Sequence, residues 1–552
     1  MTITPRFIIN RYTRDRIPLA LCLTVLLVLV AEATADDQQA PGNNCIVCHA
    51  GEQSGFNPAH AFAPDNCTAC HDGDGGSLIP QAAHEGLIAF PGNLDNAGRA
   101  CGACHANRVD GVTNNLMHSG RGMVQGTRNT LGGDNGQKAP ADLQSLGHNV
   151  ADSMLRKQCA SCHLGQKKTQ RTLDVTRDRG GGCLACHVND YPEQAHPSLT
   201  TRVSDGRCFG CHSRSGRISL SYAGLAETDA PGLRLADGRA VERLPPDAHY
   251  AAGMSCIDCH TSVGLMGDTG NAEHQRQAVD IACTDCHDND NSRITLSDWP
   301  PELARMKKHV PFATSADTNF LTTGKHGTPL WNIEILDGDV HLHTKNTNRV
   351  LAIPTPAPSR GGHDENHERL KCAACHSQWA SQCFGCHMDY DPDGEQWDHV
   401  EQAVTPGRWS DDRWHIANAL PALGVNDNNE IEAFVPGMIM TVAHPSLPEP
   451  KFVRQFAPLS PHTTGAARSC ASCHRSSEAL GLGKGELVND DDQPYFVPGL
   501  ELLEDGLPSD AWTNIDGSLG GQAPFSGQRP FNAAEMRSII EAEIAAEQSS
   551  AE

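Results

Sequence analysis

The sequence predicts a protein of mostly short α-helices and irregular loops wrapped around packed prosthetic groups, with a minor β-hairpin in the C-terminal half. Two observations support this fold class. Of the 23 cysteines, 22 form eleven C-x-x-C pairs, and a histidine follows each pair directly. All seven tryptophans lie at Trp299 or later, so the motif-rich first half has few aromatic side chains. Flat apolar groups other than aromatic side chains would therefore fill the core of that half.

The eleven motifs are the strongest chemical signal in the chain. Their cysteines are Cys45 and Cys48, Cys67 and Cys70, Cys101 and Cys104, Cys159 and Cys162, Cys183 and Cys186, Cys208 and Cys211, Cys256 and Cys259, Cys283 and Cys286, Cys372 and Cys375, Cys383 and Cys386, and Cys470 and Cys473. Their histidines are His49, His71, His105, His163, His187, His212, His260, His287, His376, His387 and His474.

Three kinds of chemistry use closely spaced cysteines, and only one explains the adjacent histidine. Structural zinc sites and disulfide frameworks do not require a histidine after every pair. Covalent c-type haem attachment does, because two thiols bind the haem edge and the next imidazole reaches the iron. We therefore expect eleven covalent haem c groups.

With these motifs, the chain resembles multihaem c-type cytochromes over residues 45–474. The segments HYAAGMSCIDCH (249–260) and CHSQWASQCFGCH (375–387) are similar to bacterial multihaem cytochromes of respiratory electron transfer. Some of these belong to the broad group that includes octahaem tetrathionate reductase and hydroxylamine oxidoreductase. The resemblance implies the fold class of a multihaem, here undecahaem, cytochrome c.

The second axial ligand decides whether a haem passes electrons or binds a substrate. Seventeen of the 28 histidines lie outside the motifs, enough for one at every iron. The favoured candidates precede a motif closely or lie in the motif-rich half: His60, His84, His118, His148, His196, His249, His274, His363 and His462. Further candidates between the last two motifs are His399, His415 and His444.

A second histidine cluster lies in the motif-free stretch 288–371. It contains His309, His326, His341, His343, His363 and His367. The sequence NIEILDGDVHLH (332–343) alternates around Asp337-Gly338, which predicts a β-hairpin. On such a strand His341 and His343 share one side. We interpret that side as a solvated face, with a haem edge or a substrate as the alternative.

The spacing of the motifs predicts four segments. Residues 1–35 form a signal peptide, 36–298 a dense eight-haem domain, 299–474 a three-haem domain with haem-poor insertions, and 475–552 a haem-free segment. In the eight-haem domain, short helices are expected to begin at or near the motifs. The last segment ends in NAAEMRSIIEAEIAAE (532–547), an amphipathic helix with Asn532 and Glu535 as its cap and an apolar face packed on its own domain.

The N-terminus and the charge bear on location and partners. Four arginines, the apolar run from Ile17 to Val30 and the segment AEATA are typical of a secretory leader. No later run approaches the roughly 18 apolar residues of a membrane span. We expect export to the periplasm or the cell exterior, with no transmembrane segment in the mature chain. The net charge of −24 argues against nucleic acid and favours redox partners with basic docking surfaces.

Two functions remain open at this point. The first is electron transfer through eleven haems in respiratory or extracellular electron transport, because eight motifs in about 250 residues force the haems close together. The second is an oxidoreductase that acts on a small nitrogen or sulfur compound at one under-ligated haem. No catalytic residue is assigned. A structural role in a haem-bearing filament is a third possibility.

Overall fold

A computed structural model gives the fold. It describes residues 43–50, 58–132, 141–170, 179–189, 196–213, 218–267, 272–288, 292–299, 303, 310, 315–354, 365–412, 415–488 and 493–542. The predicted signal peptide, His309 and His363 lie outside these residues. The chain divides into two compact units, Met1–Ile88 and Ala89–Glu552, which are described separately. The predicted boundaries at 298/299 and 474/475 stay predictions.

The first unit contains five short helical segments and almost no side-chain core. They are α2 (Cys45–Cys48), η2 (Pro58–His60), η3 (Ala63–Asp65), α3 (Thr68–His71) and α4 (Pro80–Ala83). Among its described residues, Ala63 and Ile88 are the buried apolar side chains, whereas Val47, Leu78 and Ile79 are more than 60% exposed. Two buried side chains are a small core for a segment of this size.

The helices of the second unit are short, and two of the longer ones, α6 and α11, contain residues of a motif. The longer ones are α5 (Leu94–Ala100), α6 (Gly102–Thr113), α8 (Arg121–Leu131), α11 (Asp205–His212) and α21 (Ala533–Glu541). Shorter ones away from the motifs are α7 (Leu116–Ser119), η4 (Leu143–Ser145), α9 (Val150–Met154), α12 (Ile218–Tyr222), α13 (Ala248–Ala251), α15 (Ser262–Met266), α16 (Gln275–Ala278), η8 (Leu296–Asp298) and η10 (Glu365–His367).

Strands are far more extensive than the minor hairpin that the sequence predicted. One five-stranded antiparallel sheet has the order β4 (Arg293–Thr295), β5 (Asn319–Thr322), β6 (Pro329–Leu336), β7 (Asp339–His343), β8 (Val350–Ala352). A second has the order β11 (Ala403–Asp412), β10 (Cys386–Asp398), β14 (Ile431–Ala443), β13 (Ala422–Val425), with β15 (Lys451–Pro458) also paired to β14. Three smaller sheets combine β1 (Leu225–Glu227), β3 (Ala240–Arg243) and β2 (Leu233–Arg234), β12 (His415–Ala419) and β9 (Ala380–Phe384), and β16 (Gly485–Val488) and β17 (Tyr495–Pro498).

The missed strands have an identifiable physical cause. β10 reads CHMDYDPDGEQWD, and much of it is exposed, so it has no continuous apolar alternation to reveal it. It is held by ladders to β11 and, in parallel, to β14, which begins 33 residues after β10 ends. Such non-local pairing outweighs the low intrinsic strand preference of Asp, Gly and Pro.

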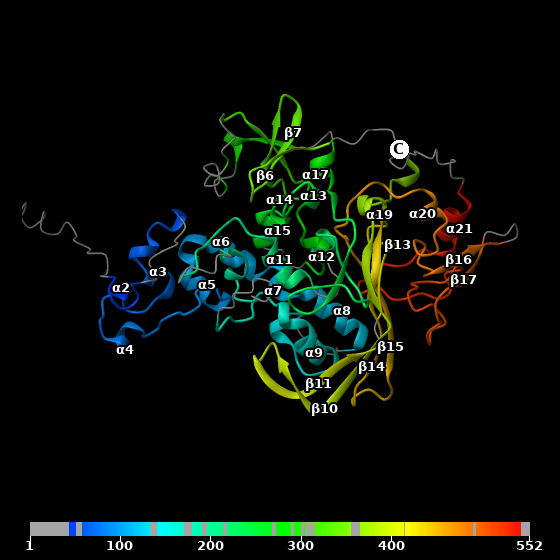
Figure 1. Ribbon diagram of the computed structural model, residues 1–552, viewed down its shortest axis with the longest axis horizontal. Coiled ribbons are helices and arrows are strands. Elements are labelled where there is room, and N and C mark those ends of the chain that lie inside the picture. The colour runs from blue at the N-terminus through cyan, green and yellow to red at the C-terminus, as the bar shows by residue number, and fades with distance from the viewer. Residues whose placement is uncertain are drawn as a thin grey trace, which may run out of the picture. The chain divides into compact units, whose positions relative to one another are not determined.

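The second sheet packs on helices from the motif-rich half, beside α8 and α9 (Figure 1). The Trp409 indole donates to the Ser153 hydroxyl (3.1 Å). The buried Arg156 guanidinium donates to Asp398 (2.8 Å). Separation of a buried ion pair costs several kcal/mol, so the Arg156–Asp398 pair holds the sheet against the helices.

Two local predictions are confirmed. β6 and β7 form the predicted hairpin, with Leu336 opposite Asp339 and with positive φ at both Asp337 and Gly338, as a two-residue turn between twisted strands requires. Helix α21 begins with the predicted capping box of Asn532 and Glu535. Its apolar face packs within its own unit, where Met536 and Ile540 are buried.

Candidate haem centres

Ten of the eleven motifs form or adjoin a helical turn, as predicted for the eight in the motif-rich half. The turns are α2, α3, the first turn of α6, η5 (Leu155–Cys159) with η6 (Ala160–Cys162), α10 (Leu184–His187), α11, α14 (Cys256–Cys259), α17 (Thr284–His287), α19 (Cys372–His376) and α20 (Ala471–His474). In such a turn the two cysteines and the histidine lie within one helical repeat. This is the spacing that a single cofactor with two side-chain bonds and one metal bond requires.

The motif at Cys383 lies outside the dense half and forms no helical turn. Cys383 lies in β9, which ends at Phe384, Cys386 begins β10, and Gly385 between the two strands has φ +78°. The Gly385 N–H donates to the Ile439 carbonyl of β14 (2.8 Å). Pairing with β12 and β14 therefore replaces the helical turn by a corner, which glycine at this φ permits.

The motif histidines share a hydrogen-bond pattern that prepares them as metal ligands. Five place Nδ1 against a backbone carbonyl: His71 on Ile88 (2.7 Å), His187 on Thr200 (2.9 Å), His287 on Pro354 (3.0 Å), His376 on Gly465 (3.0 Å) and His474 on Ile539 (2.7 Å). A carbonyl only accepts, so Nδ1 carries the hydrogen in each ring. Nε2 then has a free lone pair, which is the arrangement found around metal-bound histidines.

Four motif histidines have an off-motif histidine at a characteristic distance. The ring centroids are 6.2 Å apart for His49 and His84, 6.1 Å for His249 and His287, 6.3 Å for His260 and His462, and 6.2 Å for His367 and His474. Two imidazoles on opposite sides of one metal ion, with bonds of about 2.0–2.1 Å, have centroids about 6.3 Å apart. The residues present therefore fit bis-histidine haem at these positions.

Burial keeps several of these rings neutral, which metal ligation requires. Burial, with smaller effects from His462 and His212, lowers the pKa of His260 to about 4. Burial also lowers the pKa values of His163, His212 and His462. His163 Nε2 is buried and has no hydrogen-bond partner among the described residues, so this atom could bind a metal ion.

The backbone of His462 is constrained in a way that points to function. Its φ is +54°, which is rare for a residue with a side chain, and its Nδ1 donates to the Ser460 carbonyl (2.9 Å). Such a conformation persists only where the surroundings demand it. Here it holds the imidazole across from His260.

The structure places the other predicted distal ligands in different settings. His118 stacks on His163, with centroids 5.3 Å apart and ring planes 13° apart, and its Nδ1 donates to the Thr113 carbonyl (2.7 Å). His274 lies instead against Phe525. His60 contacts Phe62, His148 is exposed, and His196 is half-buried.

The pairing of His367 with His474 was missed as a site from the sequence. His367 belongs to the second histidine cluster and precedes Cys372 by five residues, so it fell outside the rule that favoured histidines 7 to 11 residues before a motif. The hairpin of that cluster is present, but its predicted solvated face is not seen at His343, whose side chain is 16% exposed and whose Nε2 pairs with Glu334 (2.8 Å) on the neighbouring strand.

Cysteines of different motifs lie beside one another in a connected series. Within the first unit Cys67 contacts Cys45. In the second unit thiols within hydrogen-bond reach join Cys101 to Cys183, Cys211 to Cys162, Cys256 to Cys208, and Cys283 to Cys372. Three further pairs are near enough that the charge of one thiol raises the pKa of the other, without a thiol–thiol hydrogen bond: Cys186 with Cys208, Cys259 with Cys286, and Cys375 with Cys470.

This series links eight motifs of the second unit. Seven of them form a line, in the order of their first cysteines: Cys101, Cys183, Cys208, Cys256, Cys283, Cys372 and Cys470. The eighth, the Cys159 motif, branches from the Cys208 motif through Cys162 and Cys211. The order differs from the chain order only at Cys159. If a porphyrin were attached at each motif, neighbouring sulfurs would place porphyrin edges beside one another.

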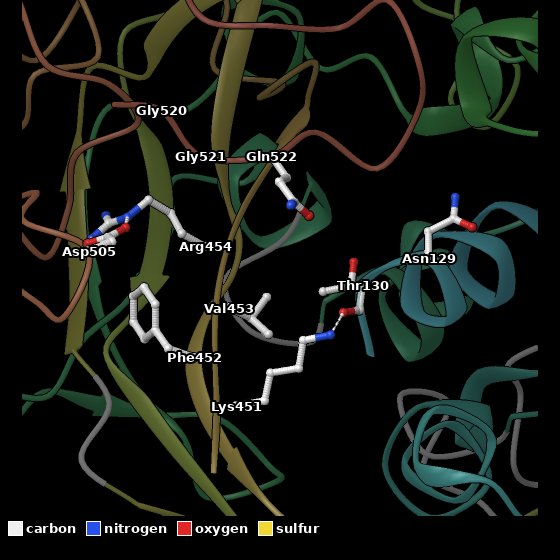
Figure 2. A pocket seen from close by; sticks show the side chains of 10 residues that line it. All are labelled: Asn129, Thr130, Lys451, Phe452, Val453, Arg454, Asp505, Gly520, Gly521 and Gln522. Atoms are coloured by element: carbon white, nitrogen blue, oxygen red, sulfur yellow. Dashed lines mark hydrogen bonds and ion pairs between the residues drawn. The ribbon is translucent and has the colours of Figure 1, made fainter. Parts of the chain in front are cut away.

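A cavity of about 280 Å³ lies away from the motifs and is lined by ten residues (Figure 2). None of these is a motif residue. Of its two cations, Arg454 is paired with Asp505 (2.9 Å), whereas Lys451 Nζ donates to the neutral Thr130 carbonyl (2.8 Å).

No protein-family model, no curated protein and no solved structure matches this chain. Among the described residues, no helix is long and apolar enough to cross a membrane. The interpretation of the motifs thus depends on their chemistry and geometry.

Proposed function

We propose that the chain is an exported multihaem c-type cytochrome that carries electrons through eleven covalently bound haems, in the periplasm or outside the cell. The observation that carries this proposal is the connected series of motif cysteines. Electrons tunnel efficiently only between cofactors whose edges are close, and the series would put eight haems edge by edge within the second unit. The histidine pairs support low-spin haems, which transfer electrons without binding a substrate.

The surface charge fits such a carrier. The chain has 67 acidic and 43 basic residues, so its field attracts basic redox partners and steers their approach. The donor and the acceptor are in that case proteins with basic docking surfaces.

Removal of one haem from the middle of the series tests the proposal. The variant Cys208→Ser/Cys211→Ser should lose one haem and interrupt the only junction that joins the motifs at Cys159, Cys183 and Cys256 within the described series. The matched variant Cys101→Ser/Cys104→Ser loses one haem at the end of the series. After pulsed reduction, internal equilibration should slow in the first variant and stay fast in the second.

Equal kinetics in the two variants would contradict the proposal. A spectrum of the oxidised protein that stays low-spin and unchanged with nitrite, hydroxylamine or cyanide supports electron transfer. A high-spin fraction near one haem in eleven that responds to these ligands would instead support the oxidoreductase.

A further inference from the structure

Asp247 is a buried carboxylate, 1% exposed, that caps helix α13. One of its oxygens accepts both the backbone N–H (2.9 Å) and the ring Nδ1–H (2.8 Å) of His249. The other oxygen accepts the N–H of Thr464 (2.7 Å). Three N–H donors therefore converge on one carboxylate, which suits its charged form.

This partner distinguishes His249 from the other paired histidines. His118, His287, His462 and His474 donate Nδ1–H to backbone carbonyls, which are neutral. A carboxylate draws the Nδ1 proton more strongly and gives the ring more anionic character. A ligand of that kind donates more electron density from Nε2 and stabilises ferric over ferrous iron.

The position of Asp247 within the series gives this difference a consequence. His249 faces His287 of the Cys283 motif, with centroids 6.1 Å apart. Thr464 follows shortly after His462, which faces His260 of the preceding Cys256 motif. The Asp247 carboxylate thus bonds directly to the imidazole of His249, the ligand proposed for the Cys283 centre. Its contact with the Cys256 centre is indirect, through the backbone N–H of Thr464 in the loop that carries His462.

We infer that Asp247 is a positioning residue that lowers the reduction potential of the haem at Cys283 and Cys286 below that of its neighbour at Cys256 and Cys259. The inference rests on the proposed function. In the step concerned, one electron from the adjacent haem converts ferric to ferrous iron, and the Nδ1 proton stays between His249 and Asp247. The carboxylate therefore creates a step in potential in the middle of the series.

The test is a potentiometric titration of the full-length holoprotein with dithionite, followed at the haem absorption bands. Asp247→Asn and Asp247→Ser remove the charge and keep an N-cap side chain. Each should move one haem component to higher potential, whereas Asp247→Glu should leave it near the wild-type value. Asp516→Asn is the matched control, because Asp516 accepts the Ser518 N–H (2.8 Å) in the same i to i+2 arrangement and bonds to no histidine.

The outcomes separate this inference from the proposed function. An upward shift of one component in both uncharged Asp247 variants, with full haem content and no shift in Asp516→Asn, supports the role of Asp247. Titrations that superimpose on the wild type at full haem content would overturn that role and leave the haem series intact. A protein without covalent haem would overturn the proposed function itself.

Discussion

His260 and His462 face each other with ring centroids 6.3 Å apart and ring planes 17° apart, although they come from distant parts of the chain. The separation equals that expected for two imidazoles on opposite sides of one metal ion. His462 holds this position with φ +54°. The facing rings of His260 and His462 therefore fit a bis-histidine centre at the Cys256 motif.

Replacement of His462 by alanine should leave one iron with an open face. We expect a high-spin ferric signal from about one haem in eleven, because water or no ligand gives a weaker field than imidazole. Electron paramagnetic resonance of the oxidised protein measures it. His326→Ala is the control, since His326 is an exposed residue outside the motifs. An unchanged low-spin spectrum in His462→Ala would show that another residue ligates this iron.

Helix α21 should stabilise the last motif through its apolar face. Ile540 is fully buried, and the neighbouring Ile539 carbonyl accepts a hydrogen bond from Nδ1 of His474 (2.7 Å). Ile540→Ala should lower the free energy of unfolding by about 2–5 kcal/mol, the usual cost of such a cavity. Chemical denaturation followed by circular dichroism measures this cost. Glu541→Ala, at an exposed position of the same helix, should change it by less than about 0.5 kcal/mol.

The N-terminal cap of the same helix should make the free energy of unfolding depend on pH. Burial alone would raise the pKa of Glu535, but hydrogen bonds from Arg529, Asn532 and Arg369 lower it to about 2. A carboxylate with a lowered folded-state pKa contributes stability that is present above about pH 4.5 and lost as the pH falls toward 2. Glu535→Gln should thus melt lower than the wild type at pH 7, and the two should converge near pH 2.

A difference in melting temperature that stays constant from pH 7 to pH 2 would assign the effect to packing rather than to charge. Asp516→Asn serves as a second comparison, because Asp516 is an exposed carboxylate near the same helix in sequence.

Electron transfer to a basic partner should be steered by charge. A small basic cytochrome c, used as the probe in stopped-flow mixing, should be reduced faster at low salt than at high salt, because screening removes the attraction of the −24 chain. The same probe with its lysines acetylated should lose most of this salt dependence. A rate that rises with salt, or equal rates for both probes, would contradict partners with basic docking surfaces.

The sequence was informative wherever the signal is local. The C-x-x-C-H spacing marks the motifs, Asp337-Gly338 marks a hairpin, and Asn532 with Glu535 marks a helix start, because each depends on residues within one turn or one strand pair. The partners of the motif histidines depend instead on contacts across the fold. His249 pairs with His287 rather than with the nearer His260, and only the folded chain shows this.

The central claim is that haem is covalently bound at the eleven motifs, and the intact mass of the purified, exported protein tests it most directly. The account predicts the mass of the processed polypeptide plus eleven haems, together with a strong Soret band that survives acid–acetone extraction. A mass equal to the bare polypeptide, or haem that the solvent removes, would contradict it.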